Sequence, residues 1–367
     1  MRNIEIDPVL AADARPIAPE KLELARSLGS RLPEAGLRRV ALIRADSLNR
    51  HADPTGSTRL ILALENLQIT GSFKIRGALS ALDAARRAGA TGVVAASAGN
   101  HGIGVARAAR LFGMSATIVV PETAAKAKIA KIRAEGAELA FTAQGYDAAE
   151  ALGRELASRR GLPWISPYDD VDVLAGNGSS LAFEIVDALG KVPEHVLVPI
   201  GGGGLATGMA WGLAASAGED PRKTRRVWTA QSEASAAFAL SLERGSAVEQ
   251  LATSEKTLAD GLEGGISATS FARASSVVAG VSVLAEARIA FAMALIHYRL
   301  GLRLEGSAAA ALVPAIDGLP PLIRGGDLVI VLTGRNVDRA VFDGLAFEPS
   351  SFARLSPECG ILVHRSA

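Results

Sequence analysis

The sequence has little cysteine, few aromatic residues and almost no net charge. Cys359 is the single cysteine among 367 residues, which excludes an internal disulfide and a cysteine-based metal cluster and fits a reducing compartment. Aromatic residues make up 4% of the chain, and 39 Lys and Arg residues stand against 38 Asp and Glu residues. Without an excess of either charge, no strong field favours binding to nucleic acid or to an anionic membrane.

Long hydrophobic runs are also missing. No run approaches the ~18 apolar residues of a membrane-spanning helix, and residues 1–7 lack the apolar region of a signal peptide. We therefore expect a soluble, cytoplasmic protein that does not bind membranes. A chain of this length can bury a large core and is expected to divide into two domains.

Short apolar stretches alternate with helical patterns along most of the chain. Strands are expected at residues 40–43, 60–64, 93–96, 116–120, 138–141, 163–168, 195–200, 226–230 and 327–332. Helical patterns occur at residues 11–14, 19–32, 124–135, 146–160, 174–189 and 285–298, whereas the tail after residue 341 has no clear period. Strands that alternate with helices of 10–15 residues are typical of a parallel, doubly wound α/β sheet.

One lysine has an unusual setting. Lys74 follows a turn at Gly71 and Ser72, starts a helix of small residues, and lies between Phe73 and Ile75. Partial burial among apolar neighbours disfavours the ammonium form and makes the amine more nucleophilic, as Schiff-base chemistry requires. The alternative for a lysine seen alone is a solvated side chain whose stem covers apolar neighbours.

Two turns between a strand and a helix are candidate anion sites. Residues 97–104 place free N–H groups and the positive end of a helix dipole at a small-residue turn, which suits a carboxylate or a phosphate. Gly201, Gly202, Gly203 and Gly204 lie between another strand and helix, where the backbone can approach an anion without interference from Cβ atoms. No Walker lysine follows, and the spacing is not that of a dinucleotide site, so a compact phosphate monoester fits better.

Taken together, these pieces resemble the tryptophan-synthase-β-type (fold type II) pyridoxal phosphate enzymes, and within them the serine/threonine dehydratases (ammonia-lyases) and serine racemase. Four stretches match in the family's order, at residues 64–78, 97–102, 201–205 and 332–336. Lesser matches lie at residues 175–178, 258–262 and 305–309. The resemblance spans about residues 40–340 and implies two doubly wound domains, 1–91 with 166–367 and 92–165, with the cofactor between them in a homodimer.

The resemblance also implies a role for each matching residue. Lys74 would hold pyridoxal phosphate covalently and then act as the base at Cα, with Phe73 beside the pyridine ring. Asn100 would bind the 3′ oxygen, and Thr333 would meet the pyridine nitrogen with a hydroxyl, which favours elimination over long-lived carbanion chemistry. The phosphate would rest on Gly201, Gly202, Gly203, Gly204 and Leu205. The substrate carboxylate would bind Ser97, Ala98, Gly99, Asn100 and His101.

The residues at three positions narrow the range of reactions that the resemblance allows. Sulfhydrylases and cystathionine synthases resemble one another in having Asp after the lysine and Thr after the asparagine, where this chain has Ile75 and His101. Serine racemases carry a second serine as the base on the opposite face, and Ala98 in that place cannot transfer a proton. The sequence therefore favours deamination of a 3-hydroxy amino acid such as L-threonine or L-serine to a 2-oxo acid and ammonia.

Other functions stay open at this point. They are β-elimination or β-replacement on another β-substituted amino acid, racemisation and, least favoured of these, a non-catalytic cofactor-binding protein. A nucleotide-binding dehydrogenase is a further, weak alternative. Arg335 replaces the usual glycine and is either solvated or directed towards the ring or an acidic substrate. Gln231 and Ala237 replace the acidic ligands of the cation site in some relatives, so no metal is expected there. The C-terminal regulatory domain of biosynthetic threonine deaminases is not expected, and His195 and His297 are expected to be structural.

Overall fold

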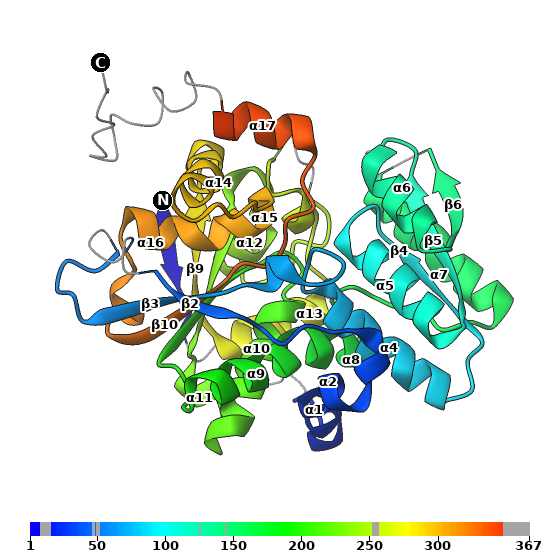
Figure 1. Ribbon diagram of the computed structural model, residues 1–367, viewed down its shortest axis with the longest axis horizontal. Coiled ribbons are helices and arrows are strands. Elements are labelled where there is room, and N and C mark those ends of the chain that lie inside the picture. Colours follow the sequence, from blue (N-terminus) through cyan, green and yellow to red (C-terminus); the bar gives the residue numbers. More distant parts are fainter. Residues whose placement is uncertain are drawn as a thin grey trace.

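The computed structural model describes residues 1–7, 16–45, 48, 52–124, 126–143, 145–251 and 257–347. Cys359, His51, His364 and the helical pattern expected at residues 11–14 lie outside these ranges. Two β-sheets of unequal size are covered by helices, and the smaller one is on the right of Figure 1. The predicted α/β class is thus confirmed. No helix within the described ranges is long and apolar enough to cross a membrane.

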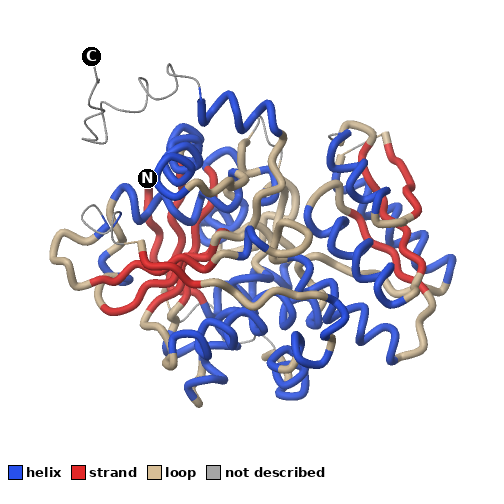
Figure 2. Tube along the Cα trace, viewed as in Figure 1, coloured by secondary structure: helices blue, strands red, loops and turns tan. Residues whose placement is uncertain are grey.

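The larger sheet has seven strands in the order β1-β9-β8-β7-β10-β3-β2. The five inner strands run parallel, and the edge strands β1 and β2 pair antiparallel with β9 and β3. Figure 2 shows these strands as the red group on the left. Their bounds are β1 (Arg2–Glu5), β2 (Leu42–Arg44), β3 (Thr58–Ala63), β7 (His195–Pro199), β8 (Val227–Ser232), β9 (Val278–Leu284) and β10 (Gly326–Val331). The sequence patterns missed β1 and β9.

The smaller sheet is entirely parallel and consists of β4 (Gly92–Ala96), β5 (Ser115–Pro121) and β6 (Glu138–Thr142). The strand expected at residues 163–168 is wrong. Only an isolated bridge forms there, between Val94 and Trp164. Pro163 and Pro167 have no N–H to donate, so this segment cannot form a regular ladder beside β4.

Most of the longer helices coincide with helical patterns of the sequence, whereas those at residues 221–224, 237–244, 268–277, 313–317 and 339–347 were not predicted. Their bounds are α1 (Pro19–Arg26), α2 (Leu28–Arg31), α4 (Lys74–Arg87), α5 (Asn100–Phe112), α6 (Lys126–Ala134), α7 (Tyr146–Arg160), α8 (Val171–Leu174), α9 (Ser180–Leu189), α10 (Gly204–Ala217), α11 (Pro221–Thr224), α12 (Ala237–Arg244), α13 (Ala268–Val277), α14 (Glu286–Leu300), α15 (Gly306–Ala309), α16 (Val313–Asp317) and α17 (Arg339–Phe347). A π-helical segment, η4 (Ala175–Ser179), joins α8 to α9.

The C-terminal helix α17 corrects the expectation of an irregular tail. Phe342 and Ala346 lie one turn apart and are both buried in the cluster that contains α14, and the Phe342 ring meets His297 edge-on at 5.1 Å. Two buried apolar residues at this spacing give the short helix an apolar face. Residues 348–367 lie outside the described ranges.

Alternation along the inner strands places apolar side chains on both faces of the larger sheet. In β3, Leu60 and Leu62 pack in the cluster with α14, whereas Ile61 and Ala63 pack in the cluster with α9 and α10. Figure 1 shows α14 to α16 above this sheet and α9 and α10 below it. Burial on both faces explains why the strands are continuous apolar runs, and it is the usual setting of parallel sheets.

Candidate active site

A cavity of about 1230 Å³ lies between the two sheets. Its wall includes residues that follow the carboxyl ends of β4, β7 and β10, where ligands bind in open α/β sheets. Every site residue expected from the sequence lines this one cavity: Phe73, Lys74, Ser97, Ala98, Gly99, Asn100, His101, Gly201, Gly202, Gly203, Gly204, Leu205 and Thr333. The tertiary structure thus brings together segments more than 200 residues apart in the sequence.

Lys74 begins α4 and has its amine on the cavity wall. Its Nζ lies 5.3 Å from the centre of the Phe73 ring and 3.5 Å from the Pro167 carbonyl oxygen. Burial lowers the pKa of Lys74 from 10.5 to about 8, and the nearby Glu305 carboxylate opposes this shift. Roughly a tenth of the amine is therefore neutral and nucleophilic at pH 7, far more than for a lysine with the ordinary pKa.

The backbone before Lys74 is paired with the segment that follows β10. Phe73 N donates to Thr333 O over 3.0 Å, and Arg335 N donates to Gly71 O over 2.9 Å. An isolated antiparallel bridge joins Ser72 to Gly334 between these two bonds. This pairing sets the start of α4 against the end of β10 and brings Lys74 and Thr333 to the same cavity.

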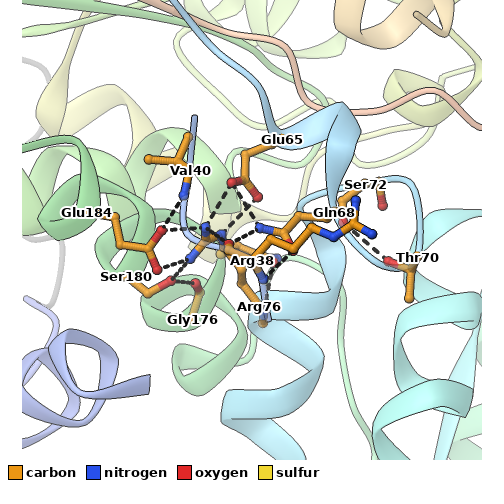
Figure 3. A network of polar contacts seen from close by, with 12 residues as sticks. Arg38, Val40, Glu65, Gln68, Thr70, Ser72, Arg76, Gly176, Ser180 and Glu184 are labelled. Carbon is orange, nitrogen blue, oxygen red and sulfur yellow. Dashed lines mark hydrogen bonds and ion pairs between the residues drawn. The ribbon is translucent and has the colours of Figure 1, made fainter. Parts of the chain in front are cut away.

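Arg76, two residues further along α4, anchors the helix through a network of polar contacts (Figure 3). Its guanidinium binds Glu65 and, through Nη1 and Nη2, also Glu184 of α9, over distances of 2.8–2.9 Å. Glu184 in turn accepts from Val40 N over 2.8 Å. Arg76 thus connects the segments that contain Glu65 and Glu184, and through Glu184 also Val40, to the helix that carries Lys74.

A close backbone contact places α4 against η4. Gly77 N donates to Asn177 Oδ1 over 2.9 Å, and a Cβ at Gly176 would lie 2.6 Å from Arg76 O. Only glycine permits this approach. Asn177 had no role in the sequence interpretation, and the structure assigns it to the support of α4.

The four-glycine segment between β7 and α10 is closely packed against its neighbours. A Cβ at Gly202 would lie 2.7 Å from Cγ of Tyr168, and a Cβ at Gly201 would lie 3.1 Å from Cα of Leu262. Gly203 has φ +80°, a left-handed conformation that other residues rarely adopt. The N–H groups of the first turn of α10 have no helical acceptor, so the segment offers backbone donors to an anion.

The turn after β4 offers a second set of backbone donors. Gly99 N donates to Ser97 Oγ over 3.1 Å, and α5 begins at Asn100, so its first-turn N–H groups are free of helical acceptors. The His101 ring lies in the wall, where Nε2 donates to the Ile165 carbonyl oxygen over 3.1 Å. Burial lowers the pKa of His101 to about 3, so the ring is neutral at physiological pH.

Glu305 is a further charged residue of the wall, for which the sequence suggested no individual role. It is 4% exposed and accepts from Asn100 Nδ2 over 2.7 Å and from Asn336 N over 3.0 Å. Burial, reinforced by Asp260, raises the pKa of Glu305 from 4.5 to about 7. A hint in the sequence is that Glu305 and Asn336 each lie in a stretch that matches the family.

Two side-chain contacts in the cavity wall join the segments that carry the two sheets. Tyr168 Oη donates to Glu150 Oε2 of α7 over 2.6 Å, and Lys128 of α6 forms an ion pair with Asp260. All four residues line the cavity. The cavity is therefore bordered by charged groups from both parts of the chain.

Other residues singled out in the sequence do not line the cavity. Arg335 is partly buried near Arg38 and Arg303, which together with burial lower its pKa. Gln231 is buried in β8, where Oε1 accepts from Ala239 N over 3.2 Å. Over the described ranges, no group of three or more His, Cys, Asp or Glu side chains could hold a metal ion. The absence of a metal stays a prediction.

Comparison with known proteins agrees with this geometry. Residues 34–334 match the family described as pyridoxal-phosphate dependent enzyme. The chain is 36% identical over 278 residues to an L-threonine ammonia-lyase of Geobacter sulfurreducens, a match that covers 75% of this chain and 66% of the relative. An L-threonine ammonia-lyase of Thermotoga maritima is 34% identical over 289 residues, with coverages of 77% and 69%. The chain thus spans about two thirds of the length of these relatives.

A solved structure shows the same fold. A threonine deaminase from T.th. superposes with a TM-score of 0.75 and 31% sequence identity, covering 88% of this chain and 99% of that chain. The expected fold type and cofactor are confirmed. With its matching segment, its fold and its cavity in agreement, this chain belongs to the pyridoxal-phosphate-dependent enzyme family.

Proposed function

We propose that this protein is an ammonia-lyase that converts a 3-hydroxy amino acid, such as L-threonine or L-serine, to a 2-oxo acid and ammonia. The observation that carries the proposal is the meeting of a buried, partly neutral Lys74 amine with the four-glycine segment in one cavity. The relatives named L-threonine ammonia-lyase support the substrate class. In the net reaction one water leaves from Cα–H and Cβ–OH, and one water is consumed when the C–N bond is hydrolysed.

The residues of the cavity fit pyridoxal phosphate. Gly201, Gly202, Gly203, Gly204 and Leu205 would hold the phosphate through backbone N–H groups at the start of α10. A side chain at Gly202 would collide with Tyr168, which keeps the backbone exposed there. Phe73 and Thr333 would contact the ring, and Asn100 would bind its 3′ oxygen. When bound, the cofactor supplies the electron sink that makes the Cα–H bond acidic.

The residues around the bound cofactor would have different roles in the reaction. The Lys74 amine would hold the cofactor and take the proton from Cα, a task helped by a pKa near the working pH. The substrate carboxylate would bind the turn formed by Ser97, Ala98, Gly99, Asn100 and His101, where first-turn N–H groups are free. Ala98 offers no group that can transfer a proton, which favours elimination over racemisation.

The domain division, the oligomeric state and the cellular location are proposed from the same resemblance. Residues 92–165 would form a small α/β domain, and residues 1–91 with 166–367 a large cofactor-binding domain. The two-sheet arrangement supports this division, since β4, β5 and β6 all fall within residues 92–165. We further propose a cytoplasmic homodimer without nucleic-acid or membrane partners, in line with the balanced charge.

The test is a panel of 3-hydroxy amino acids assayed for 2-oxo acid and ammonia. L-threonine or L-serine is expected to yield both products in equal amounts, and Lys74→Ala should lower the rate by roughly 10²–10⁴-fold. Formation of the D-amino acid without 2-oxo acid would instead indicate a racemase. Protein that binds the cofactor but transforms no member of the panel would contradict the proposal.

A further inference from the structure

Four polar side chains form one continuous chain of hydrogen bonds that reaches the cavity wall. Lys131 Nζ donates to Asn336 Oδ1 over 3.0 Å, and Asn336 Nδ2 donates to Asn100 Oδ1 over 2.7 Å. Asn100 Nδ2 then donates to Glu305 Oε1 over 2.7 Å. The chain connects α6, beside the smaller sheet, to the residue before α15, and Asn100 and Glu305 both line the cavity.

The residues at the two ends of this hydrogen-bond network fix which atoms donate and which accept along it. The Lys131 ammonium can only donate hydrogen bonds, and an ionised Glu305 carboxylate can only accept them. Asn336 Nδ2 also donates to Thr70 O over 2.9 Å, so both of its hydrogens have acceptors. If the Asn100 amide were turned over, its nitrogen would face the Asn336 nitrogen and its oxygen would face the carboxylate. The contact between the two nitrogens would be repulsive at any pH, and the contact between the oxygens would be repulsive wherever Glu305 is ionised, which leaves one orientation for Asn100.

Glu305 holds its position through a second hydrogen bond. Its Oε2 accepts from Asn336 N over 3.0 Å, so the two carboxylate oxygens serve two N–H donors of this network. The charged groups that act on Glu305 are Asp260, which disfavours its ionised form, and Lys128 and Lys131, which favour it. Lys74 is also close enough to interact with it. The two N–H donors offset part of the cost of burying the carboxylate.

We infer that Glu305 and Asn336 are positioning residues that hold the side-chain amide of Asn100 in a single orientation towards the bound cofactor. The inference rests on the proposed function, because it supposes that pyridoxal phosphate binds beside Asn100. Lys131 belongs to α6, which lies beside the smaller sheet. The position of α6 is therefore coupled to the orientation of the Asn100 amide. None of these three residues is required to exchange a proton with the substrate.

The first test replaces Glu305 by an amide of the same shape. In Glu305→Gln one oxygen remains for two N–H donors, and the new NH₂ group faces one of them. The affinity of the apo-protein for pyridoxal phosphate, measured by equilibrium dialysis, should fall about tenfold, in line with a hydrogen bond to a charged group. The pH titration of the bound cofactor's visible absorbance should also move. Glu263→Gln is the matched control, since Glu263 lines the cavity without contacting Asn100 in the structure.

The second test removes the donor at the other end. Lys131 is exposed at the surface of α6, so Lys131→Met is expected to fold even if Glu305→Gln does not, and circular dichroism checks both. Lys131→Met should weaken cofactor binding about threefold and move the absorbance titration, whereas Lys126→Met on the same helix should change neither. Affinity and titration like the wild type's in Lys131→Met, and in Glu305→Gln where it folds, would overturn the inference. Wild-type protein that takes up no cofactor would overturn the proposed function, and this inference with it.

Discussion

Arg76 and Glu65 form a two-pronged ion pair, with Nε to Oε2 and Nη2 to Oε1 both at 2.8 Å, and both side chains are fully buried. Glu184 occupies the other side of the same guanidinium. Such pairs give geometric specificity as well as energy. Because Arg76 lies two residues after Lys74, the pair holds the helix whose first residue carries the amine.

Removal of this arginine should destabilise the fold strongly. In Arg76→Met, Glu65 would be left buried without its partner, and loss of one member of a buried pair costs about 3–5 kcal/mol in the free energy of unfolding. Urea unfolding of the holo-protein measures the loss. Arg39→Met is the control, because Arg39 and Asp187 form an exposed pair at 3.5 Å whose removal should cost less than about 1 kcal/mol. Equal effects of the two substitutions would contradict this role of Arg76.

Cofactor uptake by the apo-protein should depend on pH through Lys74. Reaction with the aldehyde needs the neutral amine, so the uptake rate should rise as pH passes through about 8, well below the ordinary 10.5. Stopped-flow absorbance between pH 6 and 10 follows this rate. Between these two pKa values the folded protein binds fewer protons at Lys74 than the unfolded chain, so this residue makes the free energy of unfolding rise with pH there. A rate that rises steeply up to pH 10 without a midpoint would show that burial does not lower the pKa of the amine.

The glycine segment can be tested with two glycines that share a backbone conformation. Gly203 in the cavity wall and Gly218 at the end of α10 have φ of +80° and +68°. Alanine at either position should cost roughly 1–2 kcal/mol of conformational strain. Gly203→Ala should in addition weaken pyridoxal phosphate binding, by about tenfold if the loop shifts to relieve this strain. Gly218→Ala should leave the affinity unchanged, since a Cβ there meets open space.

Ala98 is predicted to separate elimination from racemisation. A hydroxyl at this position of the wall would provide a proton donor and acceptor where none exists, so Ala98→Ser should raise D-serine formation from L-serine by at least about tenfold. Chiral chromatography of the reaction mixture measures it. If the variant makes no more D-serine than the wild type, a residue other than Ala98 limits racemisation.

Chelating agents are predicted to leave the activity unchanged. Gln231 and Ala237 cannot supply the carboxylates of a cation site, and the Gln231 side chain is buried within β8. The measurement is ammonia release before and after dialysis against a chelator. Loss of activity that magnesium restores would contradict the prediction. Gln231→Glu, which buries a carboxylate, should lower the melting temperature whether or not magnesium is present.

Much of the site could be predicted from the sequence because its parts are local. Three stretches each place distinctive residues at the start of a helix: Lys74 with its apolar neighbours, the four consecutive glycines, and the turn before Asn100. Local patterns of this kind also placed most strands and helices. They failed where the local signal was weak or misleading, as at β9, which contains Gly280 and Ser282, and at residues 163–168, where the prolines prevent a ladder.

The amino-acid sequence by itself determined the chemistry available to this protein: an amine in apolar surroundings, backbone donors for a phosphate, and no proton-transferring group at position 98. Only the tertiary structure decided that Glu305, Asn336 and Lys131 join Asn100 in one hydrogen-bonded chain, and that Arg76 is anchored by two carboxylates. These contacts join residues up to 236 positions apart. A hydrogen bond between such distant residues leaves no periodicity or spacing in the sequence, because its geometry exists only after the two sheets have packed.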